Sequence, residues 1–153
     1  MLHRLIYHSF ATSEISAPFV ESILEECKNH NAKTDVTGCL LVSGNQFAQL
    51  IEGKELELEK IYNNVKQDKR NTEVTLIEFK ITDRRLFQMS PMAYEVVGKD
   101  DFEKIGAGSQ KDLGFVKEQP EMASKLFDYV KKLWEAEPAR QGLWHNARIG
   151  PLA

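Results

Sequence analysis

Residues 37–52 read TGCLLVSGNQFAQLIE, and the rest of the fold can be worked out from this stretch. Two runs of strand-forming residues, Thr37 to Ser43 and Gln46 to Glu52, flank the dipeptide Gly44-Asn45. Such a dipeptide suits a two-residue turn between antiparallel strands. The stretch therefore predicts a β-hairpin.

The segments on either side predict further strands and two helices. Residues 2–9 alternate as a strand, with Leu5, Tyr7 and Ser9 on one face. The other expected elements are a helix from Ser16 or Ala17 that ends before the polar run 29–33, a helix between Gly53 and Asp68, and strands at 74–81 and 92–97. The order βαββαββ indicates an α+β, ferredoxin-like fold of two split βαβ units. In such a fold the third strand lies between the first and second, and both helices cover one face.

The length of 153 residues allows one domain with a C-terminal extension. We expect residues 1–98 to form the sheet domain. Residues 99–137 are expected to form a linker and a C-terminal helix, opened by Pro120, that packs on the second face of the sheet. Residues 138–153 show no clear periodicity and are expected to form a mobile tail.

Composition limits the classes of function. A formal net charge of -3 disfavours nonspecific binding to nucleic acid. Because the sequence shows neither a signal peptide nor an apolar stretch of membrane length, we expect a cytoplasmic protein that does not bind membranes. Cys27 and Cys39 lie on apolar faces and are expected to be reduced core thiols.

Three polar residues, Tyr7, Asn31 and Gln49, stand where apolar residues would be the default. A buried polar group without a partner costs a few kcal/mol, so a converging set favours a bound polar molecule. Tyr7 and Gln49 should lie side by side on neighbouring strands, and Asn31, following the first helix, should lie at the rim of the same space. With Ile23 and Val65 on the helix faces, the set predicts a site for a planar heterocycle with polar edges.

Other interpretations of these residues remain open. A buried tyrosine often bonds only to a carbonyl group, and Asn31 alone would suit the end of a helix. For Gln49, a ligand and a network of protein side chains are equally good explanations. Cys27 and His30 could meet on a helix, but a zinc site needs further ligands that the sequence does not supply, so we expect no metal. No arrangement of nucleophile and base predicts an enzyme.

Four motifs in order resemble the BLUF family of blue-light sensors that use FAD. They are Arg4-Leu-Ile-Tyr7-His-Ser9, Asn31 to Leu41 with Val36-Thr37-Gly38, Phe47-Ala-Gln49-Leu-Ile-Glu52-Gly53, and Asp68-Lys-Arg70. The resemblance covers roughly the first hundred residues, and several ordered motifs are more specific than any one of them. The length is similar to that of short, stand-alone members of the family.

The resemblance implies a flavin, FAD or alternatively FMN, held between the two helices. Tyr7 and Gln49 would lie at its reactive edge, Asn31 at its pyrimidine edge, and Asp68 and Arg70 toward the ribityl and phosphate end. The cofactor-binding residues that it implies are Tyr7, Ser9, Ile23, His30, Asn31, Gln49, Val65, Asp68 and Arg70.

The resemblance also implies photochemistry rather than catalysis. The excited flavin would take an electron from Tyr7, a proton would follow through Gln49, and recombination would leave Gln49 rearranged. The signal would then reach the last strand through Met92. Ser90 stands at a signal-relay position where the family often has Trp, and the adjacent Pro91 stiffens the segment.

The implied function is a blue-light photoreceptor that switches a downstream protein partner or its own homo-oligomer. An alternative is a ferredoxin-like interaction module that has lost its photochemistry, for which Ser90 and Pro91 are the reason. A small flavoenzyme is a third, less favoured alternative.

Overall fold

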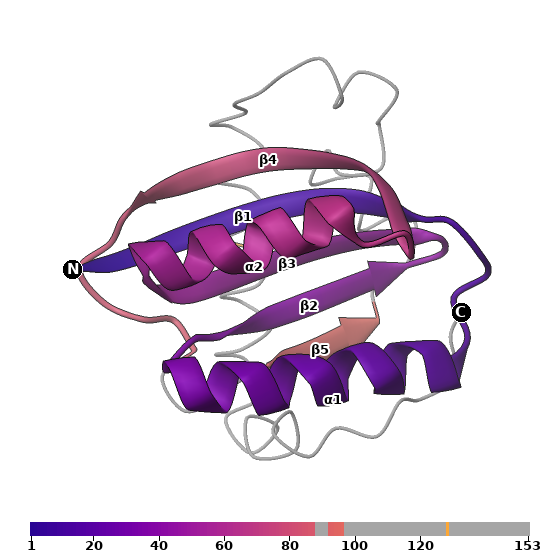
Figure 1. The fold of residues 1–153 in the computed structure, drawn as a ribbon, viewed down its shortest axis with the longest axis horizontal. Coiled ribbons are helices and arrows are strands. Elements are labelled where there is room, and N and C mark those ends of the chain that lie inside the picture. Colours follow the sequence, from indigo (N-terminus) through magenta and orange to yellow (C-terminus); the bar gives the residue numbers. More distant parts are fainter. Residues whose placement is uncertain (88–91, 97–127, 129–153) are drawn as a thin grey trace.

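The computed structural model describes residues 1–87, 92–96 and 128. Two helices and five strands make up this part of the chain (Figure 1). In chain order they are β1 (Leu2–Ala11), α1 (Ala17–Thr34), β2 (Thr37–Ser43), β3 (Gln46–Lys54), α2 (Glu55–Gln67), β4 (Asn71–Ile81) and β5 (Ala93–Val96). The predicted α+β class is confirmed. The expected C-terminal helix within residues 99–137 and the tail at 138–153 lie outside the described residues.

The five strands form one mixed sheet in the order β4-β1-β3-β2-β5. β1 pairs antiparallel with β3 and β4, β2 pairs antiparallel with β3, and β5 joins β2 in parallel. β3 therefore lies between β1 and β2, as two split βαβ units require. Both helices lie over the same face of the sheet (Figure 1), which confirms the predicted arrangement.

The hairpin at 37–52 forms as predicted. Ser43 pairs with Gln46 across a two-residue turn, in which Gly44 adopts a positive φ of 58°. Glycine takes this left-handed conformation without steric cost. Near the start of β2, a Cβ at position 38 would overlap the carbonyl oxygen of Leu50. Gly38 therefore permits the close approach of β2 to β3.

Helix α1 begins as predicted but ends later. Ser16 caps it, because its Oγ accepts a hydrogen bond from the backbone N–H of Phe19 at 3.3 Å. The helix then runs through the polar stretch 29–33 and ends where Asp35 adopts a φ of 56°. The prediction that Asn31 follows the helix is wrong. The polar stretch forms the exposed side of the last turns, while Asn31 lies on the buried side.

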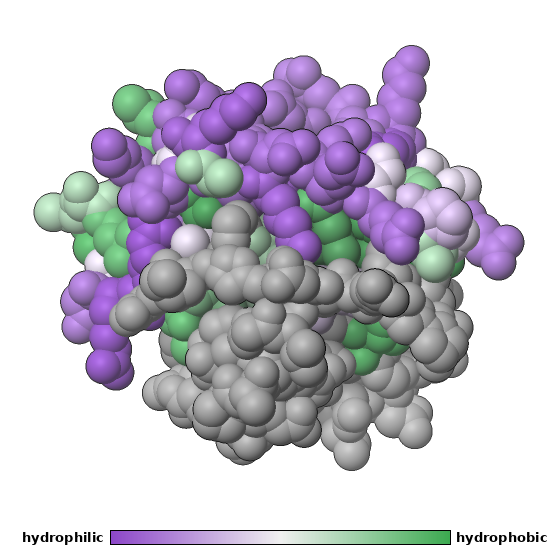
Figure 2. All heavy atoms as spheres, turned by 90° about the horizontal axis from the view of Figure 1, so that it is seen from below, coloured by the Kyte–Doolittle hydropathy of each residue, from purple (hydrophilic) through white to green (hydrophobic). Residues whose placement is uncertain are grey.

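Both faces of the sheet are buried. Leu5, Leu40 and Ile51 belong to the core on the helix-covered face, whereas Ile6 and Leu50 point to the second face and are at most 2% exposed. Among described residues, the exposed large hydrophobic side chains are Met1, Leu56 and Ile81. Hydrophilic residues dominate the described surface on the side shown in Figure 2. The described residues include no helix long and apolar enough to cross a membrane.

Candidate functional site

A cavity of about 180 Å³ lies between the two helices and the sheet. Eight of the nine residues predicted to bind a cofactor line it, namely Tyr7, Ile23, His30, Asn31, Gln49, Val65, Asp68 and Arg70. A single buried water needs only about 10–15 Å³. The cavity is therefore large enough for a ligand, and residues far apart in the sequence meet around it.

The ninth residue, Ser9, is not part of the cavity lining. Its hydroxyl donates a hydrogen bond to Oδ1 of Asn71 at 3.1 Å, and Asn71 in turn lines the cavity. The Asn71 amide also donates to the carbonyl oxygens of Val65 and Asp68, both at 3.1 Å. Ser9 thus helps to orient Asn71 rather than facing the cavity itself.

Tyr7 and Gln49 lie directly opposite each other on β1 and β3. The two residues are 5% and 3% exposed, respectively, and both side chains face the cavity. Burial raises the pKa of Tyr7 far above its usual value, with smaller contributions from Cys27, Asp68 and Tyr62. Tyr7 is therefore a neutral phenol at physiological pH, beside a buried amide.

Gln49 also contacts the residue that precedes the edge strand β5. Its Nε2 donates a hydrogen bond to Sδ of Met92 at 3.4 Å, and Met92 is fully buried immediately before β5. Met92, which was predicted to relay a signal to the last strand, thus contacts Gln49 directly. Ser90, the other predicted relay residue, lies outside the described residues.

Asn31 enters the cavity from the last turns of α1 and is 3% exposed. Its carbonyl oxygen accepts the backbone N–H of Val36 at 3.1 Å, which secures the end of the helix. The backbone of Asn31 thus serves the helix end, while its side-chain amide faces the cavity. An amide there can both donate and accept hydrogen bonds.

Cys27 is a cavity-lining residue that the sequence interpretation assigned to the core. It is partly exposed and reduced, whereas Cys39 is buried. Burial raises the pKa of Cys27 to about 11, although a hydrogen bond with Gln49 lowers it in part. Helical spacing could have located it, since Ile23, Cys27 and Asn31 follow one another at intervals of four and share a helix face.

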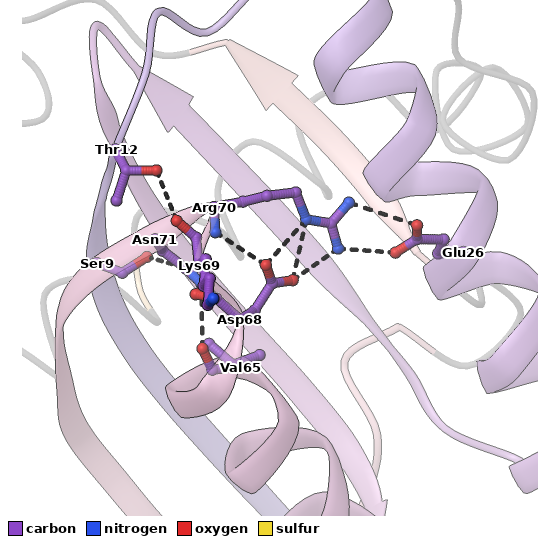
Figure 3. A network of polar contacts seen from close by, with 8 residues as sticks. All are labelled: Ser9, Thr12, Glu26, Val65, Asp68, Lys69, Arg70 and Asn71. Atoms are coloured by element: carbon purple, nitrogen blue, oxygen red, sulfur yellow. Dashed lines mark hydrogen bonds and ion pairs between the residues drawn. The ribbon is translucent and has the colours of Figure 1, made fainter.

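The polar end of the cavity is formed by charged residues (Figure 3). Arg70 donates to Asp68 from Nε and Nη2, the latter at 2.6 Å, and to Glu26 on α1 from Nη2 at 2.8 Å. A hydrogen bond from Arg70 lowers the pKa of Asp68, so this carboxyl group is ionised at neutral pH. Glu26 was not predicted as part of the site. In the described part of the chain, no cluster of three or more His, Cys, Asp or Glu side chains could hold a metal ion.

Residues 2–93 match the BLUF family, described as sensors of blue-light using FAD. The chain belongs to this family. Because the family is described as using FAD, the cofactor of this chain is a flavin.

Curated relatives match over the same region. The chain is 37% identical over 71 residues, 46% of its length, to the blue light- and temperature-regulated antirepressor BluF of Escherichia coli K12, of which the match covers 18%. It is 31% identical over 86 residues, 56% of its length, to the photoactivated adenylate cyclase subunit beta-like protein FB of Euglena gracilis, of which 10% is covered. The chain thus spans only a small part of these relatives.

Solved structures share the fold. The ground state of BlsA gives a TM-score of 0.70 at 22% identity, with 90% of both chains covered. The dark state of BlrB gives 0.66 at 21% identity, covering 86% of this chain and 96% of BlrB. Klebsiella pneumoniae BlrP1, solved with FMN and cyclic diGMP, gives 0.60 at 23% identity, covering 93% of this chain and 36% of BlrP1.

The residues around the cavity fit a flavin. Apolar side chains from both helices, Ile23 and Val65, can contact the faces of a flat ring, and the amides of Asn31 and Gln49 can pair with its polar edges. Arg70 supplies a guanidinium group for an anionic part of the ligand. This chemistry matches a heterocycle that carries a sugar alcohol and phosphate.

Proposed function

We propose that this chain is a blue-light photoreceptor in which Tyr7 and Gln49 form the photoactive pair. The observation that carries the proposal is their placement. A buried phenol and a buried amide lie opposite each other on adjacent strands, and both face a cavity between two helices. The amide also contacts Met92, next to an edge strand. This arrangement connects the ligand site directly to the rest of the sheet.

We assign the holding of the flavin to residues of the two helices and of the segment that follows α2. Ile23 on α1 and Val65 on α2 pack against the ring faces, and Asn31 pairs with its polar edge. Asp68 and Arg70, which follow α2, lie toward the sugar and phosphate end. When bound, the flavin supplies absorption of blue light and an electron acceptor.

Tyr7 supplies both the electron and the proton in this proposal. Because burial raises its pKa, the phenol keeps its proton until an electron leaves the ring. With a flavin bound, Tyr7 would give up an electron to it, and the phenolic proton would follow to the same ligand through Gln49. Both would then return to Tyr7, which would end neutral, and the donor and acceptor ends of the Gln49 amide would have exchanged places.

Such an exchange would break the contact between Gln49 and Met92. A thioether sulfur has no hydrogen to donate, so the present contact requires the NH₂ end of Gln49 to face Sδ. After the exchange, an oxygen would face the sulfur, and two acceptors do not attract each other. Met92 would then favour a different position, which would shift β5 against β2.

We propose that the shift acts on a protein partner or on the chain's own assembly, in the cytoplasm and without catalysis. The description of BluF as an antirepressor supports a protein partner. We also propose that residues 1–98 form the flavin-binding unit, and that the segments 99–137 and 138–153 respond to it.

Illumination of the purified chain tests the proposal. The protein should be yellow, and blue light should shift its flavin absorption band to longer wavelength, with return in the dark. A colourless protein that takes up no added flavin, or a loaded protein without a reversible shift, would contradict the proposal. Turnover of NADH with a second substrate would instead favour a flavoenzyme.

A further inference from the structure

One guanidinium group, that of Arg70, lines the cavity among the described residues. The lining also contains two carboxylates, those of Glu26 and Asp68, and one imidazole, that of His30. An anionic part of any ligand in this cavity is therefore best placed against Arg70. The availability of Arg70 then decides how strongly such a part is bound.

Both edges of the Arg70 guanidinium are already occupied. Nε and Nη2 contact the Asp68 carboxylate at 3.0 and 2.6 Å, while Nη1 and Nη2 contact the Glu26 carboxylate at 3.4 and 2.8 Å (Figure 3). These two-pronged contacts are the geometry in which arginine would also bind a phosphate. A phosphate that binds Arg70 through two N–H groups in this way must therefore displace one carboxylate.

Glu26 is the carboxylate more easily displaced. Asp68 is fixed locally, because its Oδ1 also accepts the backbone N–H of Arg70 at 2.9 Å and its side chain is only 30% exposed. Glu26 reaches across from α1, its side chain is 61% exposed, and its contacts are with the arginine side chain alone among the hydrogen bonds described. An exposed ion pair of this kind is weak and easily exchanged.

We propose that Glu26 competes with the phosphate of a flavin for Arg70, and so sets the preference of the pocket between phosphorylated and unphosphorylated flavins. This inference rests on the proposed function. With Glu26 in place, one positive and two negative groups leave this end of the cavity with a net charge of one negative, which disfavours a phosphate. Removal of the Glu26 charge leaves Arg70 paired with Asp68 alone and one edge open.

The substitution Glu26→Gln tests this competition. Riboflavin, FMN and FAD would be titrated into the flavin-free full-length chain, with flavin fluorescence as the readout. We expect Glu26→Gln to tighten the binding of FMN and FAD by about two- to fivefold, the range expected for release of one exposed ion pair, and to leave riboflavin unchanged. The gain should shrink at high salt, which screens exposed charges.

Two controls separate the contact from a general change in charge. Glu25→Gln removes the same charge from the neighbouring, exposed position on α1, which does not line the cavity, and should leave the ratio of FMN to riboflavin affinity unchanged. In an Arg70→Gln background, Glu26→Gln should lose most of its effect on that ratio, because the contested group is absent.

Equal effects of Glu26→Gln on riboflavin and FMN, or no effect on either, would overturn the inference. So would an equal gain from Glu25→Gln. These results would leave the photoreceptor proposal intact, provided that the loaded chain still responds to light. Failure to bind any of the three flavins would instead overturn the proposed function.

Discussion

Gln49 connects the two parts of the site at the scale of single residues. On one side it lies opposite Tyr7, and on the other it donates to the sulfur of Met92 at 3.4 Å. A polar side chain between a phenol and a thioether has a defined orientation, because only its NH₂ end can donate to sulfur. A reorientation of Gln49 would break this contact and could change the position of Met92, which precedes β5.

Substitution of Met92 by leucine should separate the light reaction from its consequence. Leucine is close to methionine in volume and should cost less than about 1.5 kcal/mol of stability, but it offers no acceptor to Gln49. We expect Met92→Leu to keep the reversible absorption shift and to lose the light-dependent change in amide hydrogen exchange at residues 93–96. A variant that keeps the light-dependent change would show that Met92 does not carry it.

The sequence was sufficient to place Tyr7 and Gln49 but not Glu26. Alternation along two strands puts Tyr7 and Gln49 on the helix-covered face, and a two-residue turn sets the hairpin register. The Glu26–Arg70 contact joins residues 44 apart in the chain. It depends on how α1 is rotated about its axis and how far it lies from α2, and neither follows from local periodicity.

At the scale of elements, β3 holds the segment that follows β4. The carboxylate of Glu52, which is fully buried, accepts the backbone N–H of Leu86 at 2.9 Å and that of Phe87 at 3.0 Å. Arg85 adds a hydrogen bond to Thr37 Oγ1 at 2.9 Å and another to the carbonyl oxygen of Asp35 at 2.7 Å. The chain is thus fastened to the ends of β2 and β3 shortly before Met92.

The Glu52 contact predicts a pH dependence of stability. Burial raises the pKa of Glu52 above its ordinary value of 4.5, although the backbone N–H groups of Phe87 and Leu86 and two arginines lower it in part. The folded chain therefore holds this proton more tightly than the unfolded chain does. Its contribution to the free energy of unfolding is complete below pH 4.5 and is lost as the pH rises through the raised pKa.

Glu52→Gln should remove this dependence, because glutamine does not titrate. We expect the difference in free energy of unfolding, wild type minus Glu52→Gln, to fall in urea titrations as the pH rises above 4.5. Glu59→Gln, which removes an exposed carboxylate from α2, should show no such fall. A difference that stays constant or rises with pH would contradict the assignment.

Local sequence patterns predicted the helices and strands themselves better than they predicted where a helix ends or which strands pair. The turn at Gly44 and the helix start at Ser16 or Ala17 are set by a few adjacent residues, and both were predicted. The end of α1 was misplaced because polar residues at 29–33 resemble a helix end as much as an exposed helix face. The parallel pairing of β5 with β2 is a contact between distant segments that local pattern does not specify.

At the scale of the whole molecule, the two ends of the sheet differ in character. The ion pairs of Arg70 lie at the end where α2 finishes and β4 begins (Figure 3). The exposed hydrophobic residues Met1, Leu56 and Ile81 lie at the opposite end, where β1 begins and β4 finishes. In our proposal, the end with the Arg70 ion pairs and the cavity together bind the ligand, and β5 is the edge strand that the switch would reach.

In the proposed mechanism the Tyr7 hydroxyl makes this molecule light-sensitive, and a pair of tyrosine variants can check this role. Tyr62 is a suitable control, since its ring lies 6.1 Å from that of Tyr7, centroid to centroid. The measurement is the light-minus-dark absorption spectrum of flavin-loaded protein. We predict that Tyr7→Phe binds flavin but loses the reversible red shift, and that Tyr62→Phe keeps it. A red shift that persists in Tyr7→Phe, or that disappears only in Tyr62→Phe, would contradict the account.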